Sequence, residues 1–360
     1  MTTANRSGPG PGAARRFSPW LFGSLLAAAL IVLAAVSLGS GYVNLGAGDI
    51  LRAAWAGLTG GASGLDEGRT MVLWDVRLPR IATALLAGAA LGLSGAVFQG
   101  LLLNPLADPY TLGVSSGAAF GAALVIIASL FAPNIGWLAA PWALTLGAFA
   151  ASCLTLAVVV ALARDRDGRL SPTNLILAGV IMSAILSAAI SFVKYLAGDQ
   201  VGSIVFWLLG SFQARTWTDA AVVFFFLLPA LAASLWHAVD LNIMTMGMRS
   251  AETLGVNTGR VRLVLLAAAS LAASAAVSVA GIIGFVGLIV PHLVRLVCGP
   301  DHRSLLPLSA LGGALLLTCA DSVVRVVLPG EIPVGVLTAL LAGPVFLVLF
   351  RRRMGGAGND

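Results

Sequence analysis

Few residues in this chain could carry out chemistry, and they are scattered along it. The three histidines, His237, His292 and His302, form no HExxH motif, the helical spacing that builds a hydrolytic zinc site. The only lysine, Lys194, is followed by Tyr195 and has no glycine at the spacing of a phosphate-binding loop. The chain therefore has no ATPase motif of its own, and we expect a protein that is not an enzyme and needs no cofactor.

One combination of side chains could still bind a metal ion. His292, Asp301 and His302 fall in or near one predicted cytoplasmic connection, but their spacing matches no familiar metal site. A membrane-embedded metalloenzyme is therefore the weakest of three hypotheses. The three cysteines lie within or beside apolar runs and form no CxxC pair, so we expect small buried residues and no disulfide framework.

Charged side chains inside the apolar runs bear on the second hypothesis, a stand-alone ion-coupled carrier or channel, because such carriers bury titrating groups in their spans. Four runs contain no Asp, Glu, Lys or Arg: residues 81–103, 111–132, 139–163 and 220–236. Asp321 and Arg325 are the main exception, and we interpret them as a structural ion pair on one helical face. The pathway is therefore expected to be neutral and to suit a bulky, already chelated cargo.

Membrane-spanning helices must position these side chains, because the composition excludes a soluble globular chain. Hydrophobic residues make up 59% and charged residues 10% of the chain, against about 25% charged in soluble domains. Runs long enough to cross a bilayer, with one shorter run, predict an all-α membrane protein of about ten helices. The predicted helices are residues 20–43, 79–103, 111–132, 139–163, 173–197, 219–239, 261–281, 286–298, 306–328 and 334–350. Residues 286–298 are too few for a comfortable span and predict a half-helix or a tilted helix.

The distribution of basic residues predicts the orientation in the membrane. With both termini in the cytoplasm, 14 of the 21 Lys and Arg residues lie on the cytoplasmic side. The other side then holds Arg52, Arg69, Arg77, Arg80, Lys194, Arg215 and Arg325. We expect a disordered cytoplasmic tail at residues 1–18, one transmembrane domain at 19–351 and a second cytoplasmic tail at 352–360.

Two segments with a shared Gly and Pro spacing suggest an internal repeat. Gly95 and Pro105 are ten residues apart, as are Gly281 and Pro291. We expect the two segments to run in opposite directions, as the halves of an inverted repeat do. Alanine-rich helices also resemble one another by chance, which is the alternative.

The connection at residues 240–262 is the most distinctive cytoplasmic segment. Its sequence, LNIMTMGMRSAETLGVNTGRVR from Leu241 on, predicts a short amphipathic helix over Arg249–Leu254 that stops at Gly255. An exposed helix with Met, Leu and Glu side chains could dock into the groove of a partner protein. An ordinary interfacial helix is the alternative. The turn-rich residues 104–109 form a second link, which could be just a tight connection.

Three blocks of sequence resemble the FecCD family of binding-protein-dependent ABC permeases. The first, Arg77 to Gly121, begins RLPRIATALLAGAALGLSG, and the second is SVAGIIGFVGLIVPHLVRLVCGPDHRSLLP from Ser278 to Pro307. The third combines Asp321 and Arg325 with EIPVGV at Glu331 to Val336. The blocks occur in the family's order and cover nearly the whole chain.

The resemblance implies a fold, a cargo class and a set of partners. Permeases of this family import iron–siderophores, haem or vitamin B12 across the bacterial cytoplasmic (inner) membrane. The chain would have ten helices, like the vitamin B12 importer permease, and form a homodimer with the pathway on the dimer axis. Two ATPase subunits would bind on the inside and one substrate-binding protein on the outside, with no nucleic acid involved. Ferric siderophore is the expected cargo, while haem and cobalamin stay open.

The resemblance also implies roles for individual residues. The cytoplasmic helix would couple the permease to the ATPase through Arg249, Ala251, Glu252, Leu254, Gly255 and Val256. Arg77, Arg80 and Arg325 would face outward and bind acidic residues on the two lobes of the binding protein, because arginine forks suit bidentate contact with carboxylates. For Arg80, which follows Pro79 at a helix start, contact with lipid headgroups is the alternative.

Overall fold

The described helices match the ten predicted spans, the last of which, residues 334–350, is described only as far as residue 344. The computed structural model describes residues 17–41, 43, 45–59, 64–132, 134–165, 170–327 and 332–344. Within these residues, 8 helices are long and apolar enough to cross a membrane, and Val286–Cys298 and Val334–Pro344 are shorter apolar helices. The long spans are α1 (Pro19–Gly39), α4 (Leu78–Leu101), α5 (Val114–Phe131), α6 (Pro141–Ala163), α7 (Pro172–Ala197), α9 (Trp217–Trp236), α12 (Thr258–Ala280) and α14 (His302–Val327). The all-α prediction is confirmed.

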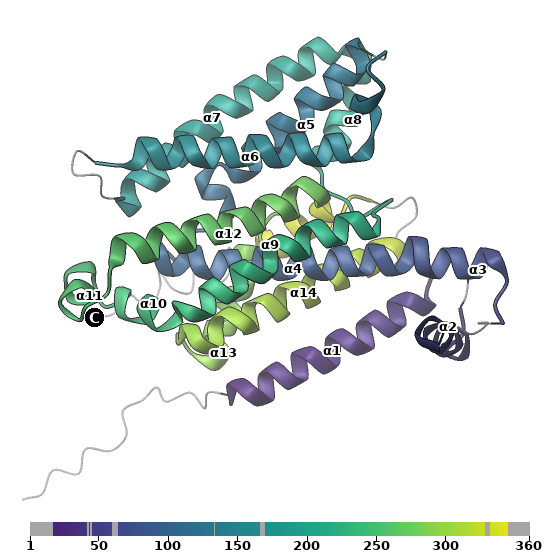
Figure 1. The fold of residues 1–360 in the computed structure, drawn as a ribbon, viewed down its shortest axis with the longest axis horizontal. Helices are drawn as coiled ribbons and strands as arrows, with labels where there is room; N and C mark the ends of the chain where they lie inside the picture. The colour runs from purple at the N-terminus through teal and green to yellow at the C-terminus, as the bar shows by residue number, and fades with distance from the viewer. Residues whose placement is uncertain are drawn as a thin grey trace, which may run out of the picture.

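The helix α4 forms the centre of the bundle. It packs against α14, α12, α9 and α13 (Val286–Cys298), while α5, α6 and α7 form a second group beside α12 (Figure 1). Of the most apolar stretch of each span, 83% is buried for the span that contains α4 but only 11% for α1, which lies along the outside of α14. Small residues let the central backbones approach closely. The clearest case is Gly95, where a Cβ atom would lie 1.9 Å from the Gly287 carbonyl oxygen.

The two ends of the bundle carry different short helices. At one end α10 (Ala238–Met244) and α11 (Met248–Thr253) join α9 to α12, and we call this the α11 end (Figure 1). The opposite end carries α2 (Ala47–Thr59), α3 (Glu67–Met71) and α8 (Val201–Leu208) (Figure 1). The two ends are therefore distinct surfaces.

Exposed tryptophans mark both ends of the bundle. Trp20 and Trp236 lie at the α11 end, and Trp137 and Trp142 stack on each other at the opposite end, with ring centroids 6.1 Å apart. Tryptophan is enriched at the two membrane–water interfaces, where its ring is apolar and its N–H can bind water. The positions of these rings fit a bilayer that crosses the bundle between the two ends.

Residues 42–77 contain more helix than their mixed, turn-rich sequence predicts. The π-helical segment Val72–Arg77 joins α3 to α4, so that one helix extends over Glu67–Leu101. Ahead of it, α2 packs Ala53 against Leu45 and Leu73 in a small apolar cluster of its own. The sequence does not predict these helices, because their apolar residues are isolated among polar ones. Only the tertiary contacts show which of these side chains pack together.

A break separates α12 from α13. α12 ends at Ala280, the next residues are not helical, and Phe285 has a positive φ of 68° just before α13. α13 starts beside Gly95 and therefore covers only part of the bundle's depth, as expected for a half-helix. The expected opposite direction of the two Gly–Pro segments is not found. α13 runs the same way as α4, because the break turns the chain back and the ends of both helices lie near His302.

The expected tails fall mostly outside the described residues. Of residues 1–18, the structure describes Phe17 and Ser18, and the Phe17 N–H donates to the Val297 carbonyl at 3.2 Å. This contact places the start of α1 against the end of α13, at the α11 end. Residues 352–360 also lie outside the described part of the chain.

Candidate functional site

The short helix α11 is anchored at its end of the bundle by hydrogen bonds and buried contacts. It covers Met248–Thr253, within one residue of the prediction, and stops at Gly255, whose φ is +85°. The Val256 N–H donates to the Ala251 carbonyl at 3.0 Å, and the Gly255 N–H donates to the Glu252 carbonyl at 3.1 Å. This pair of hydrogen bonds is a Schellman motif, which needs a left-handed residue and therefore favours glycine there. The predicted stop is confirmed together with its physical cause.

Residues of α11 divide into an anchoring side and an exposed side. Ala251 is fully buried, and Met248 and Val256 pack against the main apolar core. We call five of the exposed residues the α11 surface: Met246, Arg249, Glu252, Leu254 and Gly255. Ser250 and Thr253 are also exposed. Met246 is 73% exposed and Leu254 is 64% exposed, so the bundle does not cover these two apolar side chains. Of the six predicted coupling residues, Ala251 and Val256 therefore anchor the helix and the other four lie on its surface.

Arg262 connects α11 to the rest of the bundle. Its side chain, on the first turns of α12, is 7% exposed and donates one hydrogen bond to the Leu170 carbonyl. A second guanidinium nitrogen lies 3.2 Å from the Met248 sulfur. From the sequence, Arg262 indicates only the orientation in the membrane, although its position at a helix start beside the short helix is a signal for this contact. Arg262 thus positions the first residue of α11.

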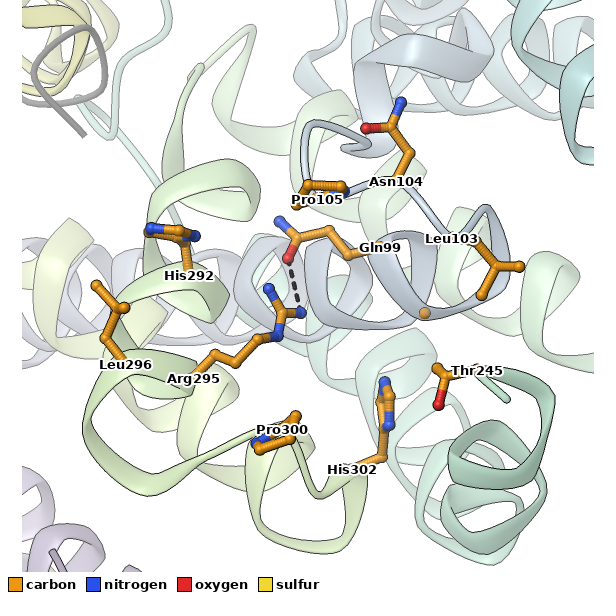
Figure 2. Close-up of a pocket in the computed structure, with 11 residues that line it drawn as sticks. Gln99, Leu103, Asn104, Pro105, Thr245, His292, Arg295, Leu296, Pro300 and His302 are labelled. Carbon is orange, nitrogen blue, oxygen red and sulfur yellow. Dashed lines mark hydrogen bonds between the residues drawn. The ribbon is translucent and has the colours of Figure 1, made fainter. Parts of the chain in front are cut away.

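A cavity of about 840 Å³ opens at the α11 end, between the end of α4 and the start of α14 (Figure 2). We call it the inner cavity. On its wall the Gln99 amide nitrogen donates to the carbonyls of Gly287 and Leu288 at 3.3 and 3.2 Å. Arg295 donates to the Gln99 side-chain oxygen at 3.0 Å (Figure 2). Gln99 therefore joins α4 to the first turn of α13 beside the helix break.

His302 stands on another wall of the inner cavity (Figure 2). Its Nδ1 lies 2.7 Å from the Asn242 side-chain oxygen, while its Nε2 is buried and has no hydrogen-bond partner among the described residues. Asn242 in turn donates to an Asp301 carboxylate oxygen at 2.7 Å. These contacts join the start of α14 to α10, next to the α11 surface.

The residues of the metalloenzyme hypothesis do not form a metal site. His292 and His302 both line the inner cavity, but the Asp301 carboxylate instead accepts the Arg303 N–H at 3.0 Å and so caps α14. The hydrogen bonds from Arg303 and from the Asn242 amide hold the pKa of Asp301 below its usual value. Among the described residues, no three His, Cys, Asp or Glu side chains are placed to share a metal ion.

At the opposite end, Arg80 forms a buried ion pair between α4 and α14. Its Nε lies 3.1 and 3.0 Å from the two Asp321 carboxylate oxygens, and its Nη2 lies 2.9 Å from one of them. Arg80 is 6% and Asp321 1% exposed, so Arg80 does not extend to lipid headgroups in this structure. The partner of Asp321 identified here is Arg80, on another helix, although the sequence suggested Arg325 four residues along.

The other two predicted docking arginines hold α1 in place. Arg77 donates to the carbonyl of Leu38, in the last turn of α1, and to that of Val43, just after the helix. Arg325 donates to the carbonyl of Ser37 and, at 2.7 Å, to its hydroxyl. Arg77 is buried and Arg325 half-buried. The structure therefore brings the three arginines together at the junction of α1, α4 and α14, where each makes contacts within the chain.

This architecture defines a class: a multi-pass membrane protein with an anchored, exposed helix at one end and an arginine-rich junction at the other. A model of the FecCD transport family matches residues 29–352, and the chain belongs to this family. It is 40% identical over 327 residues to the hemin transport system permease protein HmuU of Yersinia pestis, covering 90% of this chain and 94% of that protein. It is 38% identical over 327 residues to the ferric enterobactin transport system permease protein FepD of Escherichia coli, covering 91% and 94%.

A solved structure shares the fold. It is an inward-facing conformation of a transporter assigned to the metal-chelate type of ABC transporters, with a TM-score of 0.76 and 34% sequence identity. The match covers 93% of this chain and 99% of that chain. The present chain is therefore a multi-pass inner-membrane permease of the ABC importers, a transport subunit by class.

Proposed function

We propose that this chain is the membrane-spanning subunit of an ABC importer for a chelated iron cargo. Ferric siderophore is the first candidate, since two relatives are named for hemin and ferric enterobactin, and haem and cobalamin are the alternatives. A separate ATPase supplies the energy, and a substrate-binding protein delivers the cargo. The observation that carries this proposal is the α11 surface, an exposed apolar and charged patch on a helix that buried contacts anchor to the bundle.

The α11 surface suits the transmission of movement from an ATPase. A docking helix has to be apolar enough to seat in a groove and firmly enough attached to move its own protein. Leu254 and Met246 supply the first property, while the Schellman stop and the Arg262 contacts to Met248 and Leu170 supply the second. A push on α11 would act directly on α12, which packs against the central helix α4.

The α11 end faces the cytoplasm in this proposal, and both termini lie there. The helices place Arg164, Arg249, Arg260, Arg295 and Arg303 at the α11 end. Counted over the whole sequence, the predicted orientation puts 14 of the 21 Lys and Arg residues on this side, and such an excess is typical of the cytoplasmic side. Ten crossings, an even number, return the chain to the side on which it began. The ATPase then meets the α11 surface, and the binding protein meets the opposite end.

Docking of the binding protein is assigned to the junction of Arg77, Arg80 and Arg325. Because Arg80 already binds Asp321, a carboxylate of the binding protein would have to share or replace that partner. Arg325 is the more exposed of the three and offers the first contact. We expect Arg325→Gln to weaken binding of the partner protein by about tenfold or more, the loss typical of a charged hydrogen bond.

A matched control separates docking from general electrostatics at that end. Arg52 is exposed there and pairs with Asp49 at 2.7 Å, so Arg52→Gln removes the same charge at a site away from the junction. Surface plasmon resonance on the nanodisc-embedded permease measures both variants. Equal weakening by Arg52→Gln and Arg325→Gln would contradict docking at the junction.

Association with the ATPase tests the proposed function itself. Leu254→Asp places a charge in the apolar part of the α11 surface, and we expect the ATPase subunit to be lost on co-purification. Arg260→Gln changes an exposed residue at the same end but outside the α11 surface, and should retain the ATPase. A permease that purifies without any ATPase, and whose uptake follows an ion gradient, would instead be the ion-coupled carrier of the alternative hypothesis.

A further inference from the structure

A second cavity lies at the opposite end of the bundle, between α8 and the outer parts of α5, α6 and α12. We call this space, of about 470 Å³, the outer cavity. Its size is within the range of sites for small molecules. Its lining combines apolar and aromatic walls, two hydroxyls and one cation: Ile126, Phe206, Trp207, Ser203, Ser211 and Arg215. A cavity with this lining can hold an apolar body that carries a polar or charged group.

Arg215 has no partner in the part of the chain that the structure describes. It makes no hydrogen bond there and no ion pair within 4 Å, and its Nε is buried. The nearby Asp219 is engaged elsewhere, because one of its oxygens accepts the Thr216 N–H at 2.8 Å and the Thr216 hydroxyl at 3.0 Å. Asp219 thus caps α9 and acts on Arg215 only as a more distant charge.

The charge of Arg215 persists in this environment. Burial lowers the pKa of Arg215, while Asp219 opposes that shift, and a guanidinium stays protonated at all physiological pH values. A partly desolvated cation without a counter-ion is unfavourable. The other described arginines at this end differ. Arg52, Arg69 and Arg80 each have a carboxylate partner, and Arg77 and Arg325 donate hydrogen bonds to oxygens of residues 37–43. Arg215 is therefore the arginine at this end whose partner would come from outside the chain.

We propose that the outer cavity binds the negatively charged part of the cargo, an oxyanion such as a carboxylate or catecholate on an apolar or aromatic body. This inference rests on the proposed importer function and narrows its cargo to anionic chelates. The guanidinium of Arg215 binds the oxyanion through parallel hydrogen bonds, and Ser203 and Ser211 add hydroxyl donors. Phe206 and Trp207 provide aromatic surface for the ligand body.

Equilibrium binding to the purified chain tests the site without any other subunit. The chain is placed in phosphatidylcholine nanodiscs and given radioactive iron as a trianionic triscatecholate or as a neutral trishydroxamate. Wild type should bind the anionic chelate more tightly, and Arg215→Gln should weaken that binding about ten- to a hundredfold. Arg215→Lys keeps the positive charge but loses the two parallel hydrogen bonds of the guanidinium. Its affinity for the anionic chelate should therefore lie between those of wild type and Arg215→Gln. Binding of the neutral chelate should not change.

Lys194 provides the matched control. It is a cation near the same end, on the last turn of α7, but does not line the outer cavity, so Lys194→Gln should bind both chelates like wild type. Melting temperatures of both variants should stay at or above that of wild type, because Arg215→Gln removes an unpaired charge. Equal affinity of wild type for the two chelates would overturn the proposal. An equal loss of affinity for the anionic and the neutral chelate in Arg215→Gln would also overturn the proposal.

A lipid headgroup is the other source of an oxyanion. The assay is therefore repeated in nanodiscs that contain anionic phosphatidylglycerol, and lipid retained by the purified chain is quantified. If phosphatidylglycerol abolishes chelate binding and Arg215→Gln loses retained phosphatidylglycerol, the occupant is lipid and the cargo proposal is wrong. Chelate binding unchanged by this lipid supports it. The binding assay contains no ATPase, so it is independent of transport. Chelate binding by the purified chain without ATP-driven uptake by the complete complex would keep this site and reject the importer. ATP-driven uptake without this binding would reject the site alone.

Discussion

At the residue scale, the pair of Arg80 and Asp321 shows how this apolar bundle holds a charge. Both side chains are buried, and three hydrogen-bond distances of 2.9 to 3.1 Å satisfy them together. Such a pair adds little net stability, but the loss of one member leaves a buried charge without compensation. The pair therefore fixes how α4 and α14 meet.

A substitution at Asp321 should reveal this dependence. Asp321→Asn removes the carboxylate charge that Arg80 contacts at 2.9 to 3.1 Å, and breaking a buried ion pair in this way destabilises by about 3–5 kcal/mol and should lower the melting temperature clearly. Arg52→Gln, in an exposed pair, should cost at most about 1 kcal/mol. Thermal unfolding in nanodiscs, followed by tryptophan fluorescence, measures both. Equal melting temperatures of the Asp321→Asn and Arg52→Gln proteins would show that the buried ion pair is not needed for stability.

At the element scale, close backbone contact holds α4 against the half-helix α13. Gly95→Ala would place a methyl group 1.9 Å from the Gly287 carbonyl oxygen, so the helices must separate. We expect a loss of about 1–3 kcal/mol or more and a lower melting temperature. Gly68→Ala, in α3 with nothing within 4 Å of the new atom, is the control and should have little effect. Equal melting temperatures of Gly95→Ala and Gly68→Ala would contradict the close contact between Gly95 and Gly287.

The attachment of α11 gives a second prediction at this scale. Arg262→Gln removes the contacts to Leu170 and Met248, so α11 should open more often and residues 248–256 should exchange amide hydrogens faster. Hydrogen exchange followed by mass spectrometry measures the change, and exposed Arg260→Gln is the control. Unchanged exchange in 248–256 would mean that Arg262 does not hold α11.

Comparison of sequence and structure shows which elements are predictable. The 8 long spans follow from the length of apolar runs, and the end of α11 follows from the local need of Gly255 for a positive φ. The partner of Asp321 cannot be predicted from the sequence, because Arg80 is 241 residues away and only packing brings the two residues together. The same holds for Arg262 and Arg215, which the sequence shows as arginines near the ends of spans, without their surroundings.

At the scale of the whole molecule, the two ends must lie on opposite sides of the membrane. In a background without the three native cysteines, Ser250→Cys in α11 should react with a membrane-impermeant maleimide only after cells are opened. Asp66→Cys, before α3 at the opposite end, should react once the outer membrane or cell wall is made permeable. Both positions are exposed, so access to the reagent decides the result. The reverse pattern would invert the proposed orientation.

Assembly is the other property of the whole molecule. The proposed complex holds two copies of this chain and two of the ATPase, with one binding protein on the outside. Exposed apolar side chains recur along one face of α7, at Leu177, Ile181 and Ile185, and they require cover by lipid or protein. Native mass spectrometry of the complex released from nanodiscs should give this composition, and a single copy of the chain would contradict the dimer.

The measurement that most directly tests the importer function is uptake into proteoliposomes that contain this chain and its ATPase. A ferric siderophore bound to the substrate-binding protein is supplied on the opposite-end side, and ATP on the α11 side. Uptake should require both, and Leu254→Asp should abolish it while the binding protein still docks. Uptake of equal size without ATP or binding protein, driven by an ion gradient, would contradict the ABC importer and favour a stand-alone carrier.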